Sequence, residues 1–443
     1  MIKDSKETKL RSVKYAPPPP ELPVYGSLDP SRITYIGRTN YVAALEEKKF
    51  VFGIKRSDRR NNVYMVGKSG VGKSKLLELM IRQDIAYGYG ICLIDENGDL
   101  IKSILNFIPE ERIGDVCLID PSDAEFPVAF NPLSKIDQFS KHQLAQSFIE
   151  IMEKQFSHNW TPRLEHLFRF VCLALLDYPE ATMADMIPIL TDEEFRKKVS
   201  GFIKDEMVKR FWSEEFTGWS GKFEDDAIIP LINKLWQFLS NPILGNIFSQ
   251  KDNKIDIYDL IKENKIVLVS LAKSRLGESN AGFFGSVVAA KIKQAGMMRA
   301  SVGKEHKEFY LYFDEFQDFI TETLRTLVAE SRKYGFPVTL VHQYLGQLPP
   351  NLQSAILGNV GHLIVFRVGG EDAERLETEM TPVFKAKDMV NLATQEFYIK
   401  TTIDGEAYDP FSAEALNVLA TGQSFSEMII KESREKYSIN RKT

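Results

Sequence analysis

The sequence predicts an α/β fold with a mainly parallel central sheet and an inserted all-alpha domain. Apolar runs of strand length alternate with helical patterns, and strand–helix–strand order implies parallel strands. Between residues 137 and 250 the pattern is helical, with almost no strand signal. We therefore expect five segments: a flexible Pro-rich arm (1–30), the first part of the α/β domain (31–136), the all-alpha insert (137–250), the second part of the α/β domain (251–410), and a C-terminal helix and tail (411–443).

The composition indicates a globular protein rather than a disordered or fibrous one. Of 443 residues, 44% are hydrophobic and 26% are charged, and the formal net charge is −5. This balance gives no overall basic signal for nucleic acid, although a local basic surface is compatible with it. The chain has no run of eighteen apolar residues and no secretory start, so we expect a cytoplasmic protein with reduced cysteines (Cys92, Cys117 and Cys172).

The first α/β segment contains a complete phosphate-binding motif. The stretch VYMVGKSGVGKSKLLELMIRQDI (63–85) reads as a strand, a Gly-rich loop and a helix, and GKSGVGKS fits G-x-x-x-x-G-K-[ST]. Glycines let backbone N–H groups approach phosphate oxygens, Lys73 supplies charge for the β and γ phosphates, and the Ser74 hydroxyl can ligate Mg²⁺. The alternative is a Gly-rich turn that binds no ligand, but this does not account for a complete motif between a strand and a helix. We expect ATP and Mg²⁺ to bind at Gly67, Lys68, Ser69, Gly70, Val71, Gly72, Lys73 and Ser74.

Two further strands of this segment end in acidic residues. GYGICLIDENGD places Asp95 and Glu96 after one apolar run, and DVCLIDPSD places Asp120 after the next. Charged side chains at the carboxyl ends of parallel strands often face a ligand. For Asp95 and Glu96 a structural role remains an equal alternative.

The second α/β segment carries the acidic partner of the phosphate loop. In EFYLYFDEFQDF the run from Phe309 to Phe313 reads as a buried strand that ends on Asp314 and Glu315. This is the Walker B arrangement, in which Asp314 reaches the magnesium ion and Glu315 polarises the attacking water. An acidic pair after a strand is common by chance, but much less so downstream of a complete phosphate-binding motif.

Three polar residues downstream are candidates for a further role in catalysis. ETLRTLVAESRKYG predicts a helix with Arg332 in its last turn, and Gln343 follows the strand pattern of FPVTLVHQ. Arg332 could act as an arginine finger, with Arg367 at the end of the next strand as a second candidate, and Gln343 could sense the γ phosphate. The alternatives are a cation favoured by the helix dipole and a polar strand terminus.

Other polar and aromatic clusters have structural explanations. We expect the basic cluster around Lys55, Arg56, Arg59 and Arg60 to be a solvated turn rather than a DNA or nucleotide contact. The four tryptophans fall in the helical insert and are expected to pack in its core. The three histidines of the insert match no metal motif, so we expect no metal other than magnesium. The four tryptophans are Trp160, Trp212, Trp219 and Trp236.

The order of these motifs resembles the conjugative coupling ATPases of type IV secretion. GKSGVGKS, LIDENGD, an insert with HNWTPRLEHLFR, YFDEFQDF, ESRKYG and LVHQYLGQL occur in sequence within residues 33–405. The resemblance extends to the RecA-like hexameric DNA translocases, which include the HerA and FtsK pumps. It implies a RecA-like P-loop NTPase core, a homo-hexamer around a DNA channel, and ATP hydrolysis between subunits. The family's P-loop, Walker B, finger and sensor positions are occupied by Lys73, Ser74, Asp314, Glu315, Arg332 and Gln343.

The resemblance also bears on partners and location. It implies DNA as substrate and a relaxase or secretion-channel component as candidate partners. Many members carry an amino-terminal membrane anchor, whereas this chain has a Pro-rich arm. A position at the inner face of the membrane is therefore an alternative to a purely cytoplasmic one.

Two functions follow from these expectations. The first is an ATP-driven DNA translocase of conjugative transfer. The alternative is a nucleotide-dependent switch or adaptor that recruits a protein substrate to a secretion apparatus. Glu315 together with Gln343 favours turnover, because a pure switch has less need of a water-polarising carboxylate.

Overall fold

The computed structural model describes residues 13–41, 49–134, 140–219, 224–303, 306–419 and 422–440. These residues form two compact units, which are described separately: residues 1–83 with 337–420, and residues 84–336 with 421–443. No helix in these described ranges is long and apolar enough to cross a membrane. The segment boundaries that we expected from the sequence, at residues 30, 136, 250 and 410, remain predictions.

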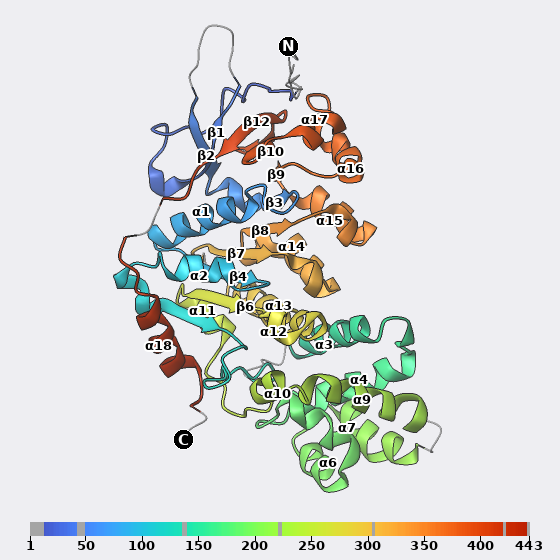
Figure 1. The fold of residues 1–443 in the computed structure, drawn as a ribbon. Coiled ribbons are helices and arrows are strands. Elements are labelled where there is room, and N and C mark those ends of the chain that lie inside the picture. Colours follow the sequence, from blue (N-terminus) through green and yellow to red (C-terminus); the bar gives the residue numbers. More distant parts are fainter. Residues whose placement is uncertain are drawn as a thin grey trace, which may run out of the picture. The chain divides into compact units, whose positions relative to one another are not determined.

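The first unit is built around strands in the order β2-β1-β12-β10-β9-β3-β8 (Figure 1). β3 is wholly buried and pairs in parallel with β8 and β9, so that Val63 lies opposite both Thr339 and His362. The outer strands pair antiparallel. The elements are β1 (Ile33–Thr39), β2 (Val51–Lys55), β3 (Val63–Val66), α1 (Lys73–Ala86), β8 (Val338–His342), α15 (Pro350–Asn359), β9 (His362–Val365), α16 (Gly370–Met380), α17 (Ala386–Asn391), β10 (Glu396–Ile403), β11 (Glu406–Ala407) and β12 (Phe411–Ala415).

The described part of the Pro-rich arm lies along the strands of this unit. The Tyr398 hydroxyl donates to the carbonyl of Lys14 at 2.8 Å, and the backbone of Ala16 exchanges hydrogen bonds with Ser412. The Gly53 N–H donates to the Pro23 carbonyl at 3.0 Å. Proline suits this extended course because it has no backbone N–H group that would need a hydrogen-bond acceptor. Residues 1–12 of the expected arm lie outside the described residues.

The second unit contains parallel strands in the order β7-β4-β6-β5. All six residues of β4 are buried, as expected for a parallel strand covered on both faces. β6 follows the helical insert and pairs with β4, with Cys92 opposite Val267, which confirms that the sheet resumes after the insert. The mainly parallel centre is therefore confirmed. The strands are β4 (Gly90–Asp95), β5 (Val116–Ile119), β6 (Ile266–Ser270) and β7 (Phe309–Asp314).

The insert, green in Figure 1, forms the expected helices. Their starts follow from local sequence: Thr161 caps α4 and Asn241 caps α10, and each is followed by a proline at the first helical position. The helices of this unit are α2 (Asp99–Leu105), α3 (Lys141–Phe156), α4 (Pro162–Leu175), α5 (Pro188–Thr191), α6 (Glu193–Ser200), α7 (Glu206–Arg210), α9 (Ile229–Leu239), α10 (Pro242–Phe248), α11 (Ile257–Lys262), α12 (Lys273–Leu276), α13 (Glu278–Ser301), α14 (Glu322–Tyr334) and α18 (Ser426–Tyr437).

The tryptophans of the insert do not all behave as expected. Trp212 is 2% exposed and packs edge-on against Phe211, which confirms a core position. Trp236 is 52% exposed, so the expectation of a core residue is wrong there. It lies on α9 on the face opposite the buried Leu231, Leu235 and Phe238, and periodicity could not show that its face is uncovered.

The C-terminal helix α18, dark red in Figure 1, packs against β5 and α2. The Ser433 hydroxyl accepts the Leu118 N–H at 2.8 Å, and the Tyr437 carbonyl accepts the Ala129 N–H at 2.8 Å. The helix thus satisfies backbone donors along β5 and the segment that follows it. The range expected as helix and tail begins with strand β12 of the first unit, and residues 441–443 of the tail lie outside the described residues.

Candidate active site

The phosphate-binding loop connects β3 to α1 in the predicted place. Gly70 has a φ of 75° and Gly72 a φ of 117°, both in the region that favours glycine. At Gly67 the restriction is steric instead, because an added Cβ would lie 2.6 Å from the Cβ of Phe366. The loop therefore requires glycine at each of these three positions, for two different physical reasons.

The loop is held from both sides within the first unit. The Lys68 N–H donates to the Arg367 carbonyl at 2.9 Å, and the Gln395 N–H donates to the Val71 carbonyl at 2.8 Å. Gln395 has a φ of 68°, which is uncommon for a residue other than glycine and marks local backbone strain. The loop is thus fixed by the residues after β9 and before β10.

Lys73 and Ser74 begin helix α1 and have different surroundings. The Lys73 ammonium donates to the carbonyl of Gly67 at 2.6 Å and to that of Lys68 at 3.1 Å, and the side chain is buried. Ser74 is exposed in the first helical turn. The start of α1 also carries the positive end of the helix dipole, which favours an anion there.

Gln343 lies directly after strand β8 in the same unit and is half-buried. Its neighbour His342 is fully buried, and the Tyr64 hydroxyl lies 3.0 Å from His342 Nδ1. Burial lowers the pKa of His342 to about 3, an effect that the nearby Lys73 charge reinforces and a hydrogen bond to the Tyr344 backbone opposes. The imidazole is therefore neutral at physiological pH.

The Walker B residues end strand β7 in the second unit, as predicted. Phe309 to Phe313 are buried, and Asp314 is 9% exposed. Glu315 is half-buried and adopts a left-handed conformation with a φ of 49°. Backbone strain of this kind in residues other than glycine clusters at functional sites, where it helps to orient the side chain.

The acidic residues after β4 have structural partners. The Asp95 carboxylate accepts the N–H groups of Asn97 and of Ile101 in the first turn of α2, and burial raises the pKa of Asp95. Glu96 forms an ion pair with Lys273 after β6. Of the two roles left open by the sequence, these contacts favour the structural one for both residues.

The two arginine candidates occupy different environments. Arg332 is exposed in the last turn of α14, where Gly335 ends the helix, and it forms no ion pair with any described residue. Arg367 is half-buried, and its backbone binds the P-loop of its own chain. The Arg332 side chain is therefore not held by an ion pair within the described residues, whereas the Arg367 backbone forms part of the support of the phosphate loop.

Residues 52–380 match the family described as type IV secretion-system coupling protein DNA-binding domain. The chain belongs to this family. It is similar to the bacterial conjugative coupling protein TrwB in an unbound form, with 14% identity, 83% of this chain and 88% of that chain covered, and a TM-score of 0.62. TrwB in complex with ADP and Mg²⁺ gives 13% identity, 84% and 89% coverage, and a TM-score of 0.63.

VirB4 of Thermoanaerobacter pseudethanolicus has the same general fold, with 13% identity, 87% of this chain and 96% of that chain covered, and a TM-score of 0.54. No curated protein matches the sequence significantly. These structural likenesses confirm the RecA-like P-loop fold of this coupling-protein family member.

Two features of this coupling-protein family member escaped sequence reasoning. The basic cluster before β3 is a solvated turn only in part: Arg60 is exposed as expected, but Arg59 is 1% exposed and donates to the Thr34 hydroxyl, and the buried Arg56 donates to the Ser31 carbonyl at 2.9 Å. The second feature is the pair of loop anchors at Arg367 and Gln395. No local sequence signal identifies Gln395, because its position depends on the pairing of β10.

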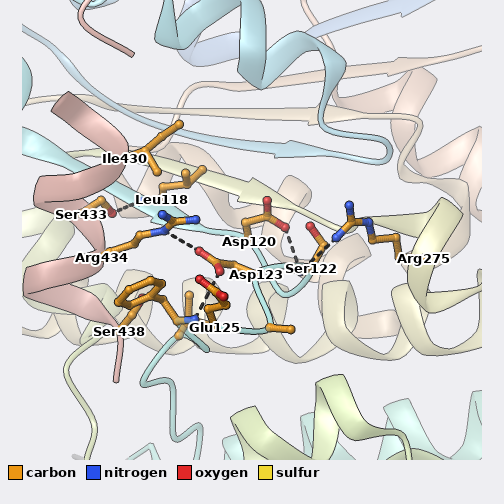
Figure 2. Close-up of a pocket in the computed structure, with 13 residues that line it drawn as sticks. Leu118, Asp120, Ser122, Asp123, Glu125, Arg275, Ile430, Ser433, Arg434 and Ser438 are labelled. Atoms are coloured by element: carbon orange, nitrogen blue, oxygen red, sulfur yellow. Dashed lines mark hydrogen bonds and ion pairs between the residues drawn. The ribbon is translucent and has the colours of Figure 1, made fainter. Parts of the chain in front are cut away.

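A cavity of about 410 Å³ in the second unit is lined by Asp120, the acidic residue after β5, and by none of the residues predicted to bind nucleotide or magnesium. It lies beyond the end of β5, between the loop that follows this strand and α18. Figure 2 shows Arg434 of α18 directed at Asp123, with Nε 2.6 Å from Oδ2, and Arg275 directed from the other side at the Ser122 carbonyl. These polar groups satisfy one another, and the cavity adds nothing to the nucleotide site.

Proposed function

We propose that this coupling-protein family member is an ATP-driven DNA translocase of conjugative transfer, which hydrolyses ATP at the subunit interfaces of a homo-hexameric ring. The observation that carries the proposal is the complete P-loop, held on both sides by Arg367 and Gln395 and followed at once by helix α1. TrwB has been solved with ADP and Mg²⁺ and with ATP and GTP analogues, which supports ATP and Mg²⁺ as the ligands of this loop.

The residues of the P-loop bind and orient the nucleotide in this proposal. Lys73 exchanges its present carbonyl contacts for the β and γ phosphates, and the N-terminus of α1 adds partial positive charge. Ser74 and Asp314 would hold Mg²⁺, since a hydroxyl and a carboxylate suit this hard cation, and the bound ion would supply positive charge to the phosphate oxygens.

The remaining residues act on the water and on the developing charge. Glu315 accepts the proton of the attacking water, and Gln343 senses the γ phosphate. Arg332 of one subunit reaches the nucleotide of the next and stabilises the charge that spreads over the transferred phosphoryl group. We place the protein in the cytoplasm, at the inner face of the membrane when a relaxase or channel component recruits it.

DNA-stimulated ATP hydrolysis tests this function. We expect the parent protein to hydrolyse ATP faster when DNA is added, and Lys73→Ala to lack this activity. Lys75→Ala is the matched control, because Lys75 lies in the same helix but is exposed and forms its ion pair with Glu78. Nucleotide binding without DNA-stimulated turnover would instead support the switch or adaptor.

A further inference from the structure

One buried aromatic pair links the phosphate loop to the turn that carries Gln343. Tyr64 lies on β3, the strand that leads into the P-loop, and His342 ends the adjacent strand β8. The Tyr64 Oη lies 3.0 Å from His342 Nδ1, and the two rings stack with centroids 5.4 Å apart. Both side chains are fully buried. In the parallel register His342 lies opposite Val66, two residues beyond Tyr64 and on the same face.

The His342 ring also constrains the backbone on the far side of Gln343. It hydrogen-bonds to the backbone of Tyr344, two residues further along the chain. A neutral imidazole has one donor and one acceptor. Donation to the Tyr344 carbonyl therefore leaves the other ring nitrogen to accept the Tyr64 hydroxyl. The His342 ring thus contacts the backbone on the far side of Gln343, and the hydrogen bond from Tyr64 helps to fix the orientation of this ring.

A carboxylate holds the same turn from a second direction. Asp372, buried on α16, accepts the backbone N–H groups of Leu345 and Gly346, which begin the turn after Tyr344. Burial and the nearby Asp372 charge raise the pKa of Tyr64, so its phenol stays protonated and donates. The segment around Gln343 is thus fixed by side chains from β3 and α16, although Gln343 itself belongs to neither contact.

We infer that Tyr64, acting through His342, is a positioning residue that holds Gln343 in register with the P-loop during ATP turnover. The inference rests on the proposed role of Gln343 as γ-phosphate sensor. Because Tyr64 and Gly67 belong to the same short strand and turn, this hydrogen bond adds a side-chain link between the phosphate loop and the Gln343 turn to the backbone pairing of β3 with β8. Loss of that bond leaves nucleotide binding intact and misplaces the sensor.

A double-mutant cycle tests this coupling. Tyr64→Phe removes only the hydroxyl, and we expect kcat for ATP to fall about fivefold, the factor that corresponds to one hydrogen bond of ordinary net strength. The KM for ATP should change less than about twofold, since the phosphate contacts remain. In a Gln343→Ala background the same substitution should have no further effect on kcat, because the group that Tyr64 positions is absent.

Tyr398→Phe is the matched control. Tyr398 is also a buried tyrosine of the first unit, but its hydroxyl bonds to the Lys14 carbonyl in the arm. Equal kcat for Tyr64→Phe and Tyr398→Phe would overturn the inference, as would an undiminished effect of Tyr64→Phe in the Gln343→Ala background. Parental turnover in Gln343→Ala would overturn it while leaving the proposed ATPase intact. A parent protein without ATPase activity would refute the proposed function, and the inference with it.

Discussion

The substitution Gly67→Ala tests whether ATP turnover requires the close packing of Gly67 against Phe366. The new Cβ would lie 2.6 Å from the Cβ of Phe366, whereas ordinary contacts begin at 3.4 Å, so the loop or the Phe366 backbone must move by about 0.8 Å. Neither atom is the end of a flexible side chain, and both segments are pinned by the hydrogen bond between Lys68 and Arg367. Displacements of about 1 Å at a reacting centre cost about 10²-fold in rate.

We therefore expect Gly67→Ala to lower DNA-stimulated ATP turnover about 100-fold, with the fold retained. Gly369→Ala is the control, because Gly369 also flanks the loop but an added Cβ there meets only Lys68 Cε at 4.0 Å, at a φ of −76°. Steady-state ATP hydrolysis and circular dichroism of both variants provide the comparison. If Gly67→Ala turns over ATP at the parental rate, close packing between Gly67 and Phe366 does not govern the site.

Three further substitutions address catalysis and pH. Glu315→Gln should bind ATP yet hydrolyse it slower by orders of magnitude, because the amide cannot accept the water's proton; loss of ATP binding would make Glu315 structural. Arg332→Ala should bind ATP and lose about 10³-fold in turnover, and mixing it with Lys73→Ala subunits should restore activity, because some interfaces then join an intact P-loop to an intact arginine. No recovery in co-assembled mixtures would argue against a finger in trans. Burial lowers the pKa of His362 to about 4, whereas the unfolded-state pKa is about 6.5. Between these two values the unfolded chain binds a proton that the folded chain does not. The free energy of unfolding should therefore decrease by up to about 1.4 kcal/mol for each unit that the pH is lowered from 6.5 to 4. Denaturant unfolding of His362→Gln should show a shallower dependence between pH 6.5 and 4, and an unchanged slope would contradict the assignment.

Local patterns predicted the parts of the fold that local chemistry determines. The P-loop glycines, the buried strand before Asp314 and the capped helices of the insert each follow from spacing and residue type within a few positions. The resumption of the sheet after the insert also followed, because β6 is too apolar to be stable outside a covered sheet.

Contacts between distant segments were not predictable in this way. The Asp95 carboxylate accepts an N–H group from the first turn of α2, and this contact depends on how the chain turns after β4. Arg59 is buried where the Thr34 hydroxyl of β1 accepts a hydrogen bond from its guanidinium, whereas the sequence shows only a cluster of positive charge. Gln395 and Arg367 anchor the P-loop through backbone atoms, which carry no sequence signature. The exposed face of Trp236 likewise depends on which helices fail to cover it.

Movement of DNA driven by ATP is the central claim, and displacement of a protein block from DNA measures it most directly. Streptavidin bound to a biotin at one end of a DNA fragment is released when a motor advances along the strand. We expect the parent protein to release streptavidin with ATP and Mg²⁺ but not with ADP, and Glu315→Gln to bind the DNA without releasing it. Release that is equally fast with ADP, or none at all despite DNA-stimulated ATP hydrolysis, would contradict a translocase.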